Sequence, residues 1–141
     1  MIAVEAAVSV AGRAPVAAAR VAEIVHAVLR RERRRAIVSI TFVGRDRMRR
    51  LNREFTGRRG VTDVIAFPLP SPSGQLAGDV YVCGWAARRA ARRFRVPFRQ
   101  ELTRVLVHGT LHVLGHDHPD GDGRTTSPMW RRQERYVAAL G

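Results

Sequence analysis

The 141-residue chain contains no lysine, a single cysteine and no long apolar stretch. The lone Cys83 excludes an internal disulfide framework and a cysteine-based zinc finger, and it fits a reducing compartment. No apolar run approaches the roughly 18 residues that a membrane-spanning helix needs. Glu5 and the absence of an early basic residue make the N-terminal segment unlike a signal peptide. These absences predict a cytoplasmic protein that does not associate with membranes.

Acidic residues are scarce beside the basic ones. The chain has 25 basic side chains, all of them arginine, against 12 acidic ones, which gives a formal net charge of +13. A GC-rich genome would account for part of the arginine excess. Guanidinium groups nevertheless stay protonated and bind phosphates through paired hydrogen bonds. The charge balance therefore predicts a polyanionic partner and salt-sensitive binding to RNA.

The length suits one domain, and no linker or internal repeat divides residues 1–141. Runs rich in β-branched and aromatic residues predict four strands, at residues 2–10, 36–43, 62–67 and 76–83. Helical periodicity, proline and glycine predict about five helices, which begin near Pro15, Asp46, Gly84, Arg99 and Ser127. Interleaved strands and helices indicate an α+β or α/β domain.

Hydrophobic side chains within the predicted helices are expected to form the core. In the helix that begins near Asp46, we expect Met48, Leu51 and Phe55 to face inward. The aromatic residues of the last three helices are also expected in the core rather than on the surface as platforms for bases. These residues are Trp85, Phe94, Phe98, Trp130 and Tyr136.

Four of the five histidines lie in one short run, from His108 to His118. His108 and His112 are about one helical turn apart, so both imidazoles lie on one helix face, about 6 Å apart along the axis. Gly115 predicts the end of that helix and lets the chain fold back at His118. Chance clustering is the alternative, but a third histidine after a helix-ending glycine favours a metal site.

Three neutral imidazoles around one ion, with the fourth position left to water, are typical of catalytic zinc. The free N–H groups of such ligands need hydrogen-bond acceptors. The candidate acceptors are Asp117, Asp120 and Glu101, and His116 is a spare histidine that could help in the same way.

The residue after the first histidine of the run bears on the chemistry. Zinc peptidases with a His-Glu-x-x-His motif place a glutamate there as general base, whereas this chain has Gly109. A metal site without that carboxylate, in an arginine-rich protein, favours a phosphodiester substrate, because metal and arginines both neutralise charge on a phosphorane. A metallopeptidase is therefore the weaker alternative.

The histidine run resembles the hallmark of the YbeY-type endoribonucleases, a family of bacterial rRNA maturation factors. That hallmark reads His-Gly-x-Leu-His-Leu-x-Gly-Tyr-Asp-His. This chain matches it at His108, Gly109, Leu111, His112, Gly115, Asp117 and His118. A second family block is similar to Asn52 followed by TDVIAFP at residues 62–68, and a third is similar to Gly78-Asp79-Val80.

The resemblance implies a single-strand-specific, zinc-dependent endoribonuclease that acts in 16S rRNA 3′-end maturation and in ribosome quality control. It implies one Zn²⁺ ion, held by His108, His112 and His118 at the mouth of a basic cleft. The implied fold is α+β, with a four-stranded mixed sheet and helices packed around it. The implied partners are single-stranded or ribosomal RNA and the small ribosomal subunit, with no DNA.

Two alternatives stay open. The nucleophile is either water or the neighbouring 2′-hydroxyl of the RNA. The protein either cleaves RNA or serves as a non-catalytic, zinc-containing ribosome assembly factor.

Two positions depart from the family pattern. His116 replaces its usual tyrosine, and Thr56 stands where the resemblance implies an arginine that touches substrate phosphate. Arg58 or Arg59 would then supply that guanidinium, and Asp117 would orient a ligand or a water molecule. Further arginines on two predicted helices are expected to bind RNA: Arg49, Arg50, Arg53, Arg88, Arg89, Arg92 and Arg93.

Overall fold

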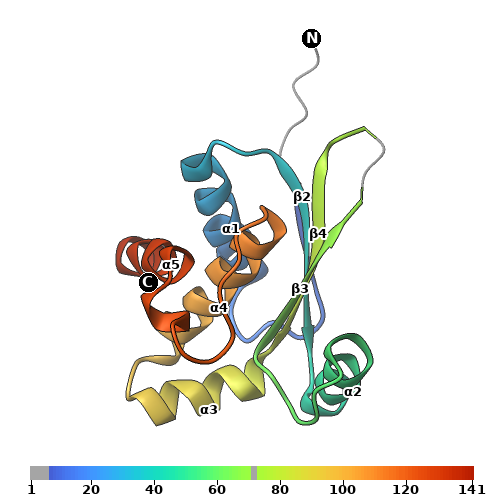
Figure 1. Cartoon of the computed structure of the whole chain (residues 1–141), viewed down its shortest axis with the longest axis vertical. Helices are drawn as coiled ribbons and strands as arrows, with labels where there is room; N and C mark the ends of the chain where they lie inside the picture. Colours follow the sequence, from blue (N-terminus) through green and yellow to red (C-terminus); the bar gives the residue numbers. More distant parts are fainter. Residues whose placement is uncertain (1–6, 71–72) are drawn as a thin grey trace.

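Four strands form one mixed sheet in the computed structural model, which describes residues 7–70 and 73–141 (Figure 1). The strands are β1 (Ala7–Ala11), β2 (Ala36–Val43), β3 (Val64–Leu69) and β4 (Leu76–Cys83). Their order across the sheet is β1-β2-β4-β3. Strands β1, β2 and β4 run parallel, whereas β3 pairs with β4 in antiparallel orientation. The mixed four-stranded sheet is therefore confirmed.

Five α-helices surround this sheet in the described part of the chain, as expected for the α+β class. They are α1 (Ala18–Glu32), α2 (Arg45–Thr56), α3 (Gly84–Phe94), α4 (Phe98–Val113) and α5 (Pro128–Leu140). A short 3-10 helix, η1 (Arg124–Thr126), precedes α5. No helix among residues 7–70 and 73–141 has the length and apolar character required to cross a membrane.

Several element bounds differ from the sequence-based prediction, most by one or two residues. β3 continues through Pro68 rather than ending before it, which is tolerated because an edge strand has backbone groups without ladder partners. α1 begins at Ala18 rather than near Pro15, because the intervening residues first connect the sheet to the helix layer. The predicted strand at residues 2–10 is seen as β1, and its residues 2–6 lie outside the described part.

Helices cover the two faces of the sheet unequally. Figure 1 shows α1, α4 and α5 on one side of the sheet and α2 on the other. The larger core joins α1 and α4 to the inward residues of β2 and β4, which include Val38, Ile40, Val80 and Val82. A smaller cluster on the opposite face holds Met48 of α2 together with Val43, Ile65 and Cys83.

Two glycines let α4 lie directly against β4. A Cβ atom on Gly109 would lie 2.6 Å from Val80 Cγ1, and one on Gly78 would lie 2.5 Å from Val113 Cγ2. Carbon atoms do not approach so closely, so only glycine permits this helix-to-strand distance. The face that α4 turns toward the sheet is fixed in this way, and with it the direction of the neighbouring histidines.

The prediction that the aromatic residues of α3 are buried is wrong. Phe94 is 62% exposed and Trp85 is 39% exposed. The helix packs through its small residues Ala87 and Ala91, which leaves the two large rings of the same helix outside the core. In α5, by contrast, Tyr136 is buried as predicted.

On α2, two of the three expected core residues point inward. Met48 is fully buried and Leu51 is half-buried, but Phe55 is 55% exposed. Phe55 lies over the edge strand β3, where its ring contacts Phe67 edge-on, with 4.7 Å between the ring centroids. The strand covers one side of the ring and leaves the other side to solvent.

Candidate metal centre

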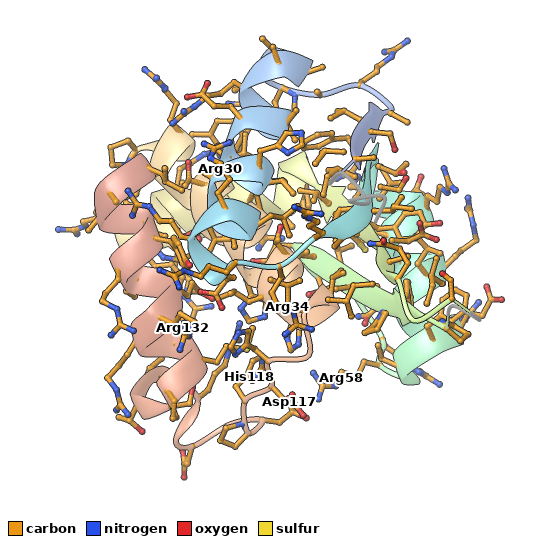
Figure 2. The ribbon with its side chains drawn as sticks, turned by 90° about the horizontal axis from the view of Figure 1, so that it is seen from above. Arg30, Arg34, Arg58, Asp117, His118 and Arg132 are labelled. Atoms are coloured by element: carbon orange, nitrogen blue, oxygen red, sulfur yellow. The ribbon has the colours of Figure 1, made fainter. Side chains whose placement is uncertain are left out.

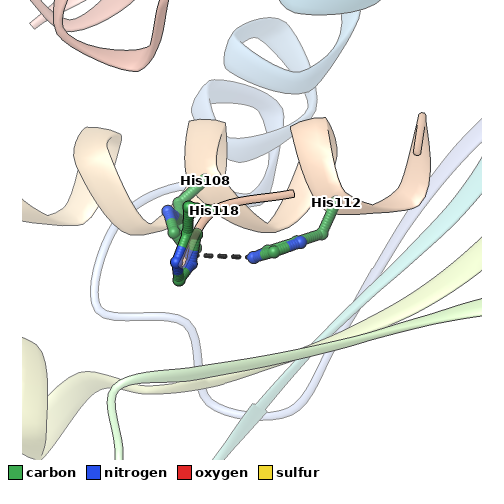
Figure 3. Close-up of side chains that lie close together, drawn as sticks. All are labelled: His108, His112 and His118. Carbon is green, nitrogen blue, oxygen red and sulfur yellow. Dashed lines mark hydrogen bonds between the residues drawn. The ribbon is translucent and has the colours of Figure 1, made fainter. Parts of the chain in front are cut away.

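Three histidine side chains converge at the C-terminal end of α4 (Figure 3). His108 and His112 project from successive turns of the helix. The helix then ends, Gly115 takes up a left-handed conformation with φ of 97°, and the chain reverses toward His118. The Nε2 atom of His108 lies 3.1 Å from that of His112 and 3.3 Å from that of His118. The spacing and the helix-ending glycine therefore predicted this cluster correctly.

The nitrogen spacing fits a tetrahedral zinc site. Zinc binds histidine nitrogen at about 2.0–2.1 Å, which places two ligands of a tetrahedron about 3.3–3.4 Å apart. The His108–His112 and His108–His118 separations, 3.1 and 3.3 Å, are close to that value, and all three ligand nitrogens lie within 4.8 Å of one another. Among the described residues, no further histidine, cysteine, aspartate or glutamate belongs to this group. Three protein ligands leave one coordination position open, as in catalytic rather than structural zinc sites.

Burial keeps two of the rings in the neutral form that a metal ion needs. His108 is buried, and burial lowers its pKa to about 4, with a smaller contribution of the same sign from His112 and an opposing hydrogen bond from Gln133. Burial also lowers the pKa of His112, and the neighbouring His118 adds to this effect. Both rings are therefore uncharged at neutral pH, with a lone pair available for metal binding.

Hydrogen bonds to the opposite ring nitrogens fix which nitrogen carries that lone pair. His108 Nδ1 lies 2.6 Å from the Oε1 atom of Gln133, whose own amide nitrogen donates to Glu134 at 3.0 Å. The Gln133 oxygen is thus an acceptor, and His108 donates through Nδ1. His118 Nδ1 donates to the carbonyl of Pro119 at 3.0 Å. Both rings are held with Nε2 directed at the shared position.

The acceptors expected from the sequence take other partners. Asp117 accepts a hydrogen bond from the backbone N–H of His118 at 2.8 Å, so it positions the turn rather than a ring. Glu101 binds Arg104, and Asp120 binds Arg58. The role of Gln133 was missed, although one signal was present. It lies on the apolar stripe of α5 that includes Met129 and Tyr136, where a polar residue requires a partner.

A buried carboxylate anchors the turn that carries His118. Glu32, at the end of α1, accepts hydrogen bonds from His116 Nε2 at 2.9 Å, from Arg132 Nη1 at 2.9 Å and from the Tyr136 hydroxyl. Burial alone would raise the pKa of Glu32, but these three donors together lower it. His116 is therefore a structural residue that ties the turn to α1 and α5.

Thr56 organises the loop that carries the two candidate phosphate-binding arginines. Its hydroxyl contacts the side-chain oxygen of the buried Asn52 at 2.7 Å and accepts a hydrogen bond from the backbone N–H of Arg58. Arg58 Nη2 donates to the Asp120 carboxylate at 3.0 Å. Figure 2 shows Arg58 extending toward Asp117 and His118. Arg59 is exposed and forms no ion pair within residues 7–70 and 73–141. Of the two arginines, Arg58 is thus the one directed at the histidine cluster.

The seven arginines expected to bind RNA all lie on exposed surfaces of α2 and α3. Those of α3 face two directions. The guanidinium of Arg88 lies 4.0 Å from the Phe98 ring, whereas that of Arg89 lies 4.8 Å from the Trp85 ring. Another arginine, Arg124, was not singled out from the sequence, although it lines a cavity of about 400 Å³ that opens beside His108.

The chain is an α+β domain with three clustered histidines and a large excess of positive charge. These features define a class of proteins suited to metal-assisted chemistry on a polyanion. Comparison with known proteins identifies the family. The family model described as "Endoribonuclease YbeY" matches residues 10–141. The chain belongs to the endoribonuclease YbeY family.

Individual relatives agree with this assignment. The endoribonuclease YbeY of Halorhodospira halophila is 34% identical over 138 residues, which cover 94% of this chain and 88% of the relative. That of Thermotoga sp. strain RQ2 is 37% identical over 100 residues, 71% of this chain and 65% of the relative. That of Anaeromyxobacter sp. strain Fw109-5 is 49% identical over 85 residues, 59% of this chain and 44% of the relative. In the last two comparisons, the chain spans less than two thirds of the relative's length.

A solved structure shares the fold. The solution structure of TM1509 from Thermotoga maritima superposes with a TM-score of 0.68 at 29% identity, covering 94% of this chain and 88% of that one. The four-stranded sheet and its helices are thus also found in an experimentally determined structure.

Proposed function

We propose that this protein is a metal-dependent endoribonuclease that cleaves single-stranded RNA, with Zn²⁺ as its metal. The observation that carries the proposal is the convergence of three histidine Nε2 atoms on one position, where a tetrahedral metal ion would keep its fourth coordination position open. Membership of the endoribonuclease YbeY family supports RNA as the substrate. The proposed setting is the cytoplasm, in 16S rRNA 3′-end maturation and ribosome quality control on the small subunit.

The donor set fits zinc, and His108, His112 and His118 would hold the ion. When bound, zinc would act as a Lewis acid toward phosphoryl oxygen and lower the pKa of water. The Nδ1 partners of His108 and His118 would hold these two rings in the orientation that such an ion needs.

The remaining roles fall to side chains around the histidines. Arg58 would bind a non-bridging phosphate oxygen, exchanging its exposed contact with Asp120 for the substrate. Asp117 would act as a positioning residue, because its carboxylate holds the backbone N–H of His118. The exposed arginines of α2 and α3 would attract the rest of the RNA chain.

The surroundings of Gly109 do not favour a peptidase. This position faces β4, where even a Cβ atom would collide with Val80, so a general base could not stand there and face the metal. A non-catalytic assembly factor is the second candidate, favoured by Thr56 in place of the implied arginine.

The decisive experiment combines metal loading with RNA cleavage. We expect the zinc-loaded protein to cut a labelled single-stranded RNA, to leave the same sequence in a duplex intact, and to stop when a chelator is added. His112→Ala should lose both bound zinc and cleavage, whereas His26→Ala, which removes a histidine of α1 outside the cluster, should retain both. Full cleavage by His112→Ala would contradict the proposal. Binding of RNA without cleavage by the zinc-loaded protein would support the assembly factor instead.

A further inference from the structure

The outer face of α3 combines exposed aromatic rings with arginines. Phe94 and Trp85 are the most exposed large rings of this helix, and Arg89 and Arg93 lie beside them. The guanidinium of Arg89 lies 4.8 Å from the Trp85 ring centroid, and that of Arg93 lies 5.6 Å from that of Phe94. From α2, the guanidinium of Arg45 approaches Trp85 to 5.3 Å. These cation–π contacts hold the guanidinium groups over the rings while their N–H donors remain available.

This face is hollowed, and the hollow leads to the metal centre. A depression of about 410 Å³ runs between α3 and the residues just before β3. It adjoins the cavity of about 400 Å³ beside His108, because Asp63, Ala90 and Phe94 line both. We name the two together the α3 groove; its outer part is formed by Asp63, Trp85, Arg89, Ala90, Arg93 and Phe94.

The charges along the α3 groove change from one end to the other. Beside His108, the carboxylates of Glu101 and Glu134 are both bound to Arg104, at 2.8 and 2.9 Å. At the junction, Asp63 lines both hollows, and its carboxyl group suits the amino groups of a base better than a phosphate. Beside Trp85 and Phe94, the lining carries Arg89 and Arg93, whose guanidinium groups suit phosphates. A polymer with bases on one side and phosphates on the other matches this arrangement.

We propose that the α3 groove binds the single strand of RNA adjacent to the metal centre, with a base stacked on Phe94 and phosphates held by Arg89, Arg93 and Arg45. The inference rests on the proposed function, which supplies RNA as the substrate. It also gives a reason for single-strand specificity. A base can stack on an exposed ring only when it is unpaired and free to leave its neighbours, whereas a duplex keeps its bases stacked internally.

The first test measures binding without metal and without cleavage. The probe is a fluorescently labelled, unstructured RNA of about 12 nucleotides, within the span of known single-strand sites. Phe94→Ala should weaken binding at least about fivefold, and Phe94→Trp, which keeps a stacking surface, should restore it. Because Phe94 is mostly exposed, the alanine variant should remain folded, which circular dichroism checks. Equal affinity of Phe94→Ala and the unaltered protein would overturn the proposal.

Charge-matched double variants separate the α3 groove from general attraction. Arg89→Ala with Arg93→Ala removes two arginines of the groove, whereas Arg88→Ala with Arg92→Ala removes two on the other side of α3, near Phe98. We expect the groove pair to weaken RNA binding several-fold more than its counterpart. Equal losses would mean that only net charge matters and would overturn the proposal.

A spectroscopic test distinguishes RNA from an acidic protein partner. In Trp130→Phe, Trp85 is the one remaining tryptophan of the chain, so its fluorescence reports on the α3 groove. Oligouridylate should quench this fluorescence, and an oligoaspartate peptide of equal charge should not. Quenching by the peptide alone, or by both equally, would overturn the assignment to RNA.

The outcomes are separable from those of the proposed function. If the protein fails to cleave RNA but loses RNA affinity in Phe94→Ala, the groove stands and the catalytic proposal fails. If the protein cleaves RNA and Phe94→Ala binds and cleaves normally, the catalytic proposal stands and the groove fails.

Discussion

The metal centre and the α3 groove are neighbours built in opposite ways. The candidate metal centre lies on α4, whose buried face contacts the sheet through Gly109, and two of its three rings are held by partners outside the cluster, His108 by Gln133 and His118 by Pro119. The α3 groove is formed by exposed arginines and rings on a helix that packs through two alanines. Ion binding requires nitrogen positions accurate to a few tenths of an ångström, which only dense packing provides. Attraction of a flexible polyanion requires charge and surface, which exposed side chains provide.

The comparison predicts that variants of the two regions have separable effects, and the largest effect is expected at Arg58, which extends toward the turn that carries His118. Arg58→Ala should lower kcat/KM for RNA cleavage about 100-fold, because the guanidinium that we propose to contact the reacting phosphate is lost. The zinc content and the free energy of unfolding of this variant should equal those of the unaltered protein, since the exposed ion pair between Arg58 and Asp120 contributes little to stability.

Arg59→Ala removes the same charge from the residue next to Arg58 and serves as the matched comparison. We expect only a few-fold loss of kcat/KM in this variant, measured with the same RNA. Equal losses in the two variants would show that Arg58 has no special position.

The second prediction concerns the buried region. Gln133→Leu should lower zinc affinity about 10- to 100-fold, because His108 loses the acceptor that orients its ring. RNA affinity of the metal-free protein should stay the same. Competition with a chromophoric chelator measures the zinc affinity, and Gln100→Leu, a glutamine at the start of α4, is the control. Unchanged zinc affinity in Gln133→Leu would contradict the role of this hydrogen bond.

The smallest expected effect is on stability and depends on pH. Glu32→Gln should lower the free energy of unfolding at neutral pH by about 1–3 kcal/mol, because a buried carboxylate loses charge-assisted bonds with Arg132, His116 and Tyr136. The pKa of Glu32 is lowered in the folded protein from its ordinary 4.5, so its contribution is complete above that pH. It disappears as the pH falls through the folded value.

Urea unfolding at neutral pH and near pH 3 checks this prediction. The difference between the unaltered protein and Glu32→Gln should shrink at the lower pH. Glu23→Gln, which removes an exposed carboxylate paired with Arg20, should change the free energy of unfolding by less than about 0.5 kcal/mol. A difference between Glu32→Gln and the unaltered protein that is the same at both pH values would contradict the account.

Local patterns predicted the elements and the three-histidine cluster, because both depend on residues close together in the sequence. The alternation in β2 and the spacing of Val21, Ile24, Val25 and Val28 in α1 correspond directly to the buried positions. The three histidines are likewise separated by one helix turn and one short loop.

Contacts between distant segments were not predictable in the same way. Gln133 lies 25 residues from His108, and Glu32 lies 84 residues from His116, so no local spacing connects them. The exposure of Phe94 was mispredicted for a related reason. Helical periodicity defines two faces of α3, but only the neighbouring α4 determines that the alanine face is the one that packs.

The most direct test of the central claim is X-ray absorption spectroscopy at the zinc edge of the zinc-loaded protein. The account predicts one zinc ion per chain, with three imidazole nitrogens at about 2.0–2.1 Å and one oxygen from solvent. Substitution of His112 should remove this spectrum. A fourth protein ligand, or a first coordination sphere with fewer than three imidazoles, would contradict it.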